Sequence, residues 1–113
     1  MPESTVEQIV GERQAGSTLV LGLSGELDLH AAIRCGPPID RALTSRPRHT
    51  VVDLREVTFL DCSGLALLLR VRKQVARWGG AFAVHCPDRT ALRVLRYVTL
   101  TAPLTFVESL PAD

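Results

Sequence analysis

The residues of this chain best suited to chemistry stand in one short stretch, Asp61-Cys62-Ser63-Gly64, between an apolar strand pattern and a leucine-rich helical pattern. The first turn of a helix leaves backbone N–H groups without partners and carries the positive end of the helix dipole. Asp61 or Ser63 could cap such a turn, and the pattern taken alone favours this structural role. A hydroxyl at a helix start is also often exposed, so Ser63 is a candidate site for phosphorylation.

A phosphate on Ser63 would add about −1.5 to −2 charges and three acceptor oxygens to the surface. The helix N-terminus would tolerate this anion well. Two carboxylates would oppose it if their loops meet at one edge of the sheet: Asp61, and Asp28 at the end of the stretch Ser-Gly-Glu-Leu-Asp. Such a modification need not refold the protein, because it would act by repelling an acidic or closely fitting partner.

Enzymatic chemistry has little support in the sequence. Ser63 lacks the Gly-x-Ser-x-Gly spacing of a nucleophile elbow, and no histidine stands in a position to act as its base. Cys62 would need an activating environment, and an inert thiol is the simpler interpretation. No Walker A loop, Gly-x-Gly-x-x-Gly motif or Cys-x-x-Cys spacing occurs, and the three cysteines and three histidines are scattered. We therefore expect no catalysis, no metal site and no cofactor.

Length and charge restrict the class of protein. The 113 residues fit a single domain over 1–113. The formal net charge of +1 gives no electrostatic sign of binding to nucleic acid or to an anionic membrane. The longest aliphatic run, Leu65–Leu69, is far shorter than the roughly 20 residues of a membrane span, and the polar start Met1–Ser4 does not resemble a secretory signal. We expect a cytoplasmic monomer without membrane or nucleic-acid partners.

Hydrophobic periodicity predicts an α/β domain with the element order β-β-α-β-α-β-α-β. The first strand is expected over Val6–Val10, ended by Gly11, with a turn at Gly16 joining it to the second in a hairpin. Further elements are predicted as strands over 19–23, 51–54 and 81–86, helices over 63–78 and from 88 onward, and a strand or extended tail over 104–110. This order indicates a mixed, mostly parallel sheet of four to five strands with about three packed helices.

Two helices carry further expectations. Asp28 is a good N-cap for the first, but Gly36-Pro37-Pro38 should interrupt it, so we expect a loop or short turn and then a helix that restarts near Pro37 or Pro38 and ends by Arg46. In the helix that Ser63 opens, the spacing of the polar residues puts them together on one exposed face: Arg70, Lys73, Gln74 and Arg77.

Three segments of the chain are similar to one known family, and together they cover most of its length: Leu23–Ala32, Val51–Leu69 and, more weakly, Lys73–Leu95. The chain resembles STAS domains, and among them the bacterial anti-sigma factor antagonists. The most specific feature is a Val-x-Asp-Leu strand followed by Thr-Phe-Leu-Asp-x-Ser-Gly-Leu. Gly36-Pro37-Pro38 departs from the family, in which the first helix usually runs without interruption.

The resemblance implies a phosphorylation switch. An anti-sigma factor that is also a GHKL-type serine kinase would bind the unphosphorylated antagonist, release its sigma factor and phosphorylate Ser63, and a metal-dependent serine phosphatase would reverse the modification. By the same resemblance Asp61, Cys62 and Gly64 belong to the switch turn, and Asp28 to the loop beside it. Arg70, Lys73 and Arg77 are candidates for the partner-binding surface, although an ordinary solvated face explains this basic stripe equally well.

Two other functions remain open from the sequence. The same fold could serve without phosphorylation as an adaptor or scaffold subunit of a lipid-transport ATPase or of a stress-sensing complex. A small enzyme or redox protein that uses Cys62 or Ser63 is the weakest hypothesis, because no base, metal set or cofactor loop accompanies these residues.

Overall fold

The computed structural model describes residues 10–112. The elements follow in chain order as β1 (Val10–Ala15), β2 (Thr18–Leu27), α2 (Leu29–Ala42), a 3-10 helix (Leu43–Ser45), β3 (His49–Leu60), α3 (Cys62–Ala76), β4 (Ala81–His85) and α4 (Arg89–Val98). This part of the chain therefore contains four strands and three α-helices, and it confirms the predicted α/β class.

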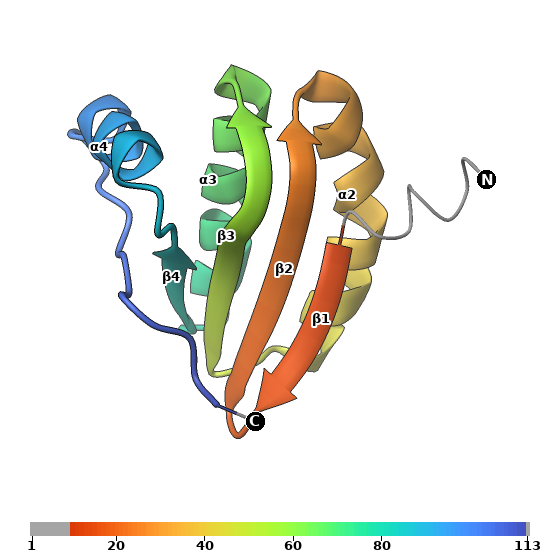
Figure 1. Ribbon diagram of the computed structural model, residues 1–113. Helices are drawn as coiled ribbons and strands as arrows, with labels where there is room; N and C mark the ends of the chain where they lie inside the picture. The colour runs from red at the N-terminus through yellow and green to blue at the C-terminus, as the bar shows by residue number, and fades with distance from the viewer. Residues whose placement is uncertain (1–9, 113) are drawn as a thin grey trace.

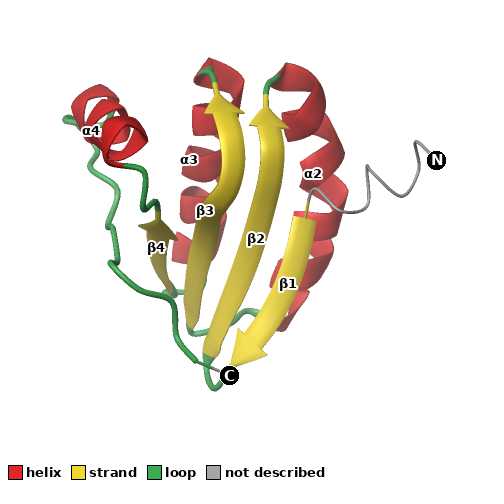
Figure 2. Ribbon diagram, viewed as in Figure 1, coloured by secondary structure: helices red, strands yellow, loops and turns green. Residues whose placement is uncertain are grey.

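The four strands form one sheet in the order β1-β2-β3-β4. The pair β1 and β2 is an antiparallel hairpin, whose turn contains Gly16 at a φ of +63°. The pairs β2–β3 and β3–β4 are parallel, and α2 and α3 supply the crossovers between them. Both of these helices lie together on one face of the sheet, whereas α4 stands to one side beyond β4 (Figure 1). The same arrangement, coloured by secondary structure, shows how short β4 is beside β3 (Figure 2).

The core lies between the sheet and the α2–α3 layer. Alternate residues of β2 face it, as the two-residue period of a strand requires, and Leu21 is paired with Val52 of β3 across the sheet. The helices contribute a second set of buried side chains, among them Cys35, Ile39, Leu68, Val71 and Val75. Val20 and Val51, which alternate with the core residues along the central strands, are also buried.

The strand boundaries required several corrections. The prediction that Gly11 ends the first strand is wrong, because β1 runs from Val10 through Gly11 to Ala15; residues 6–9 lie outside the described part. Strands β2 and β3 also extend further than predicted, to Leu27 and Leu60. The sequence at these ends is polar, but hydrogen bonding between the two strands continues, and Leu27 is fully buried opposite Leu60.

The prediction that Gly36-Pro37-Pro38 interrupts the first helix is also wrong. Helix α2 runs without a break from Leu29 to Ala42, and both prolines lie inside it. A proline within a helix removes a hydrogen bond and costs about 3 kcal/mol. The burial of Cys35 and Ile39 on either side offsets this cost, because both side chains pack into the core. The 3-10 turn then ends at Ser45, so the predicted end by Arg46 is confirmed.

The C-terminal tail closes the far edge of the sheet. Thr105 and Val107 exchange backbone hydrogen bonds with Val84 of β4, and Val84 forms an isolated parallel bridge with Phe106. The predicted tail is therefore extended, without forming a full fifth strand in the described residues. Arg72 of α3 holds the preceding loop by donating to the carbonyl oxygens of Ala102 (2.8 Å) and Pro103 (3.0 Å).

Candidate functional site: the switch turn

The two candidate loops meet at the carboxyl end of the parallel strands. Leu27 ends β2 and Leu60 ends β3, and these two residues are paired across the sheet. Asp28 and Asp61 each follow directly, and the backbone N–H of Asp61 donates to the carbonyl oxygen of Leu27 at 3.4 Å. The structure therefore confirms that the loops lie side by side at the edge where such sheets usually hold functional groups.

Both aspartates cap helices. The carboxylate oxygen Oδ1 of Asp61 accepts hydrogen bonds from the backbone N–H groups of Ser63 (2.8 Å) and Gly64 (3.2 Å), at the start of α3. Asp28 does the same for α2, accepting from the N–H of Ala31 at 2.9 Å. The capping role predicted for this turn thus belongs to Asp61, which leaves the hydroxyl of Ser63 unused for that purpose.

Ser63 has a hydroxyl that is both reachable and uncommitted. Its side chain is half-buried beside the exposed Cys62, and its hydroxyl forms no hydrogen bond with any residue in the range 10–112. The backbone is nonetheless fixed, because Asp61 holds the N–H of Ser63 in place. The hydroxyl is therefore available for modification at a backbone position that the Asp61 cap defines.

Gly64 lets α3 start close against the end of β2. A Cβ atom on Gly64 would lie 2.6 Å from the carbonyl oxygen of Leu27, 2.9 Å from its Cβ and 3.0 Å from Cγ of Leu60. Backbone cannot yield to such an overlap, so only glycine fits. Gly64 is itself buried, so any influence on a partner would pass through the position of the helix start.

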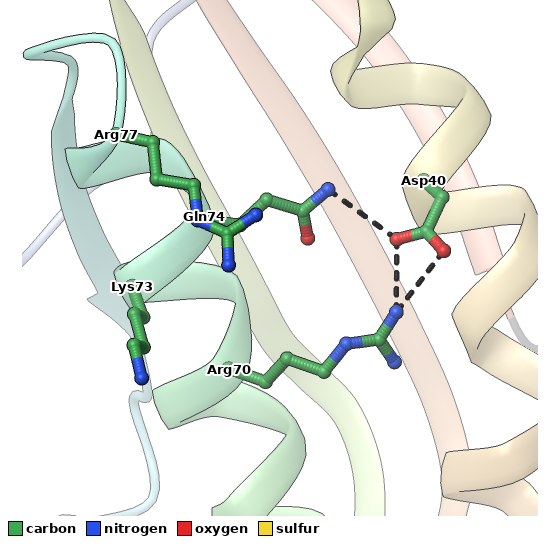
Figure 3. Close-up of a pocket in the computed structure, with 5 residues that line it drawn as sticks. All are labelled: Asp40, Arg70, Lys73, Gln74 and Arg77. Atoms are coloured by element: carbon green, nitrogen blue, oxygen red, sulfur yellow. Dashed lines mark hydrogen bonds and ion pairs between the residues drawn. The ribbon is translucent and has the colours of Figure 1, made fainter.

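The three basic residues expected on α3 are exposed, as predicted, but they are not equivalent. Arg70 donates to both carboxylate oxygens of Asp40 on α2 at 3.0 Å, and Gln74 reaches the same carboxylate at 3.4 Å. Lys73 and Arg77 line the same hollow, which has a volume of about 290 Å³ (Figure 3). Arg70 thus braces the two helices, while its neighbours extend the basic surface.

Ser63 stands at the head of this basic face. Residues seven apart lie on one side of a helix, so Ser63, Arg70 and Arg77 form a single row along α3. Arg70 contacts α2 at Gly36 and Asp40. The row of α2 that contains Gly36 and Asp40 continues toward its start through Leu29 and Ile33, at spacings of three and four residues.

Leu29 and Ile33 are site candidates that sequence reasoning missed. Their spacing fits a buried helical face, yet their side chains are 62% and 66% exposed. Leu29 and Ile33 lie one helical turn apart, so together they form a small exposed apolar strip on α2. The sequence offered one signal, because a helix that buries Ala31 and Cys35 turns Leu29 and Ile33 toward its flank.

The remaining thiols are buried away from this turn. Desolvation raises the pKa of Cys35 to about 11 and, less strongly, raises the pKa of Cys86 above its ordinary value. Both therefore stay protonated at neutral pH. Among residues 10–112 there is no group of three or more His, Cys, Asp or Glu side chains placed to hold a metal ion. None of the helices within residues 10–112 is long and apolar enough to cross a membrane.

Comparison with known proteins shows the family to which this fold belongs. The family model described as "STAS domain" matches residues 11–110. The chain belongs to the STAS domain family. An anti-sigma F factor antagonist from Paenibacillus polymyxa is 37% identical to this STAS protein over 78 residues, which cover 68% of the chain and 66% of the relative. The aligned part therefore spans slightly less than two thirds of the length of that relative.

Solved structures share the fold at low sequence identity. A putative anti-sigma factor antagonist from Thermotoga maritima superimposes with a TM-score of 0.77 at 17% identity, covering 93% of this STAS domain and 91% of that chain. The Bacillus cell fate determinant SpoIIAA in its phosphorylated form gives a TM-score of 0.65 at 22% identity, covering 88% and 92%. These similarities confirm the STAS fold that the sequence predicted.

Proposed function

We propose that this STAS protein is an anti-sigma factor antagonist that is switched off by phosphorylation of Ser63. In its unphosphorylated form it binds an anti-sigma factor and thereby frees a sigma factor. The observation that carries the proposal is the Ser63 hydroxyl, which is free of hydrogen bonds within the described residues and fixed by the Asp61 cap. The 37% identical relative named anti-sigma F factor antagonist supports it.

The surface around Ser63 suits a partner that fits closely. The exposed aliphatic pair Leu29 and Ile33 on α2 would supply apolar contacts, and Lys73 and Arg77 on α3 would supply charge. Ser63 belongs to the same two-helix face. A phosphate there would introduce negative charge into a desolvated interface, next to Asp61 and Asp28. Binding would weaken without any change of fold.

We further propose the partners, the binding residues and the state in which the protein acts. The kinase is the anti-sigma factor itself, with a GHKL-type ATPase fold, and a metal-dependent serine phosphatase restores the free hydroxyl. Asp28, Asp61, Cys62, Gly64, Arg70, Lys73 and Arg77 form or position the partner-binding surface. The protein acts as a monomer in the cytoplasm, as a binding protein and not as an enzyme, without a cofactor.

A paired capture from the native cell extract tests the switch. One bait carries Ser63→Ala and the other Ser63→Asp, and bound proteins are identified by mass spectrometry. We expect a GHKL-type ATPase on the alanine bait and its loss from the aspartate bait. Equal retention of one partner by both baits would contradict the switch and favour an adaptor whose Ser63 is never modified.

A further inference from the structure

The second half of β3 has a strand partner on one side only. Its pairing with β4 ends at Asp53 opposite His85, whereas its pairing with β2 continues to Leu60 through two register shifts. No other strand among residues 10–112 pairs with this half of its outer edge. Helix α4 stands beside it instead (Figure 1), and a hollow of about 260 Å³ separates the two.

The hollow meets β3 along its edge. Four consecutive residues of the strand, Val57 to Leu60, line it. Thr58 is an extra residue in the pairing of β3 with β2, because Gly25 pairs with Val57 and Glu26 with Phe59, so the strand bulges at this point. The hollow lies between α4 and the side of β3 opposite its partner β2, so the strand edge that has no strand partner there borders the hollow.

The other surfaces of the hollow are mainly apolar. Leu54 and Leu95 are buried and form its floor, while Phe59 and Val94 stand on its rim with 53% and 55% of their side chains exposed. An unpaired strand edge next to an apolar trough is the arrangement that binds an extended peptide, because the edge supplies hydrogen bonds and the trough takes alternate side chains. A helix would leave the edge groups unpaired.

We propose that this β3–α4 groove receives an extended segment of the anti-sigma factor, which adds as a strand to the free edge of β3. This inference rests on the proposed function, since it names how the same partner is held. The groove leads to the switch turn, because Leu60 is followed directly by Asp61 and the Ser63 turn. The segment would alternate apolar residues and carry a basic residue near Asp88, the carboxylate that lines the groove.

The test compares two variants of the same helix in the Ser63→Ala background. Val94→Arg places a long charged side chain in the groove, whereas Tyr97→Arg makes the same charge change at a 74% exposed position that does not line it. The probe is the purified ATPase captured by the Ser63→Ala bait, and its affinity for each variant is measured by calorimetry. We expect Val94→Arg to weaken binding about tenfold or more and Tyr97→Arg to change it less than about twofold.

Hydrogen exchange of the full chain provides a second measurement that does not depend on a variant. Binding of the ATPase should slow exchange of backbone amides within residues 55–60, because an added strand pairs them. Equal affinity of both variants, or unchanged exchange in 55–60, would overturn the groove while the Ser63 dependence of capture still stood. Failure of the alanine bait to capture any ATPase would instead overturn the proposed function itself. Protection of 55–60 by self-association alone, seen as a dimer by light scattering, would assign the groove to a second copy and also overturn the proposal.

Discussion

The two helix starts at the carboxyl edge of the sheet, those of α2 and α3, are built in nearly the same way. In each, a leucine ends a strand, an aspartate caps the next helix, and the residue three positions later donates its N–H to that cap: Ala31 to Asp28, Gly64 to Asp61. The two positions between also correspond, because Leu29 and Cys62 are exposed, and His30 stands where α3 has Ser63.

The differences between these two helix starts show which features serve the fold alone and which are particular to the candidate site. The α2 start tolerates a Cβ atom at Ala31, whereas the α3 start is pressed against Leu27 and needs glycine at the matching place. Only the α3 start carries a hydroxyl. Capping chemistry is thus common to both junctions and explains their aspartates, while tight packing and a modifiable group are confined to the junction that begins with Asp61.

The largest effect on stability should come from substitutions at the residue three positions after each capping aspartate. Gly64→Ala should destabilise the fold by about 3 kcal/mol, because the new Cβ would overlap the backbone oxygen of Leu27. The matched change Ala31→Gly should cost about 1–2 kcal/mol, through backbone entropy and the loss of one buried methyl group. Urea unfolding followed by circular dichroism measures both. Equal costs would show that the two junctions are packed alike.

Removal of the caps should have a smaller effect. Asp61→Ala should cost about 1–2 kcal/mol, since it leaves two donors without an acceptor, and Asp28→Ala should cost about 1 kcal/mol. The same unfolding measurement applies, with Asp→Asn variants as controls, because asparagine retains an accepting oxygen. A larger loss from Asp28→Ala would mean that the α2 cap does more than its single hydrogen bond indicates.

A negative charge at the second helical position should hardly change stability at either junction. Ser63→Asp and His30→Asp should each stay within about 0.5 kcal/mol of the parent, because the helix dipole favours the charge while the capping aspartate opposes it. Thermal unfolding at low and high salt measures the balance. If Ser63→Asp alone destabilised the fold strongly, the loss of partner binding by this variant would reflect unfolding. Such a result would contradict the proposal that charge at Ser63 acts on binding without a change of fold.

A last pair of regions to compare is the exposed and the buried thiols. Iodoacetamide at pH 8 should label exposed Cys62 and spare Cys35, whose buried thiol has its pKa raised to about 11. Because the folded pKa of Cys35 lies above its ordinary value of 9.0, the folded state holds a proton that the unfolded state loses. The free energy of unfolding should therefore fall as pH rises from 9 through 11.

The labelling is checked by mass spectrometry of native and urea-treated protein. Rapid labelling of Cys35 in the native protein would contradict its burial.

Much of this protein could be predicted from patterns a few residues long. The fold class, the hairpin at Gly16, the capping aspartates and the switch turn all depend on side chains near in sequence to the backbone that they organise. Caps and turns are local, so the residues that determine them are readable in order.

Only the tertiary structure decided how these parts meet. Burial of Cys35 and Ile39 against the sheet keeps α2 helical through two prolines, although local propensity argues for a break. The pairing of Arg70 with Asp40 joins residues 30 apart and gives one of the three expected cations a charged partner at the surface. The glycine requirement at position 64, the exposure of Leu29 and the free edge of β3 likewise depend on which elements lie side by side. The sequence by itself determined the order of the elements and the caps that begin two of the helices. The packing of the helices against the sheet determined the continuity of α2 and which side chains stay exposed, because contact between distant segments follows from their arrangement in space.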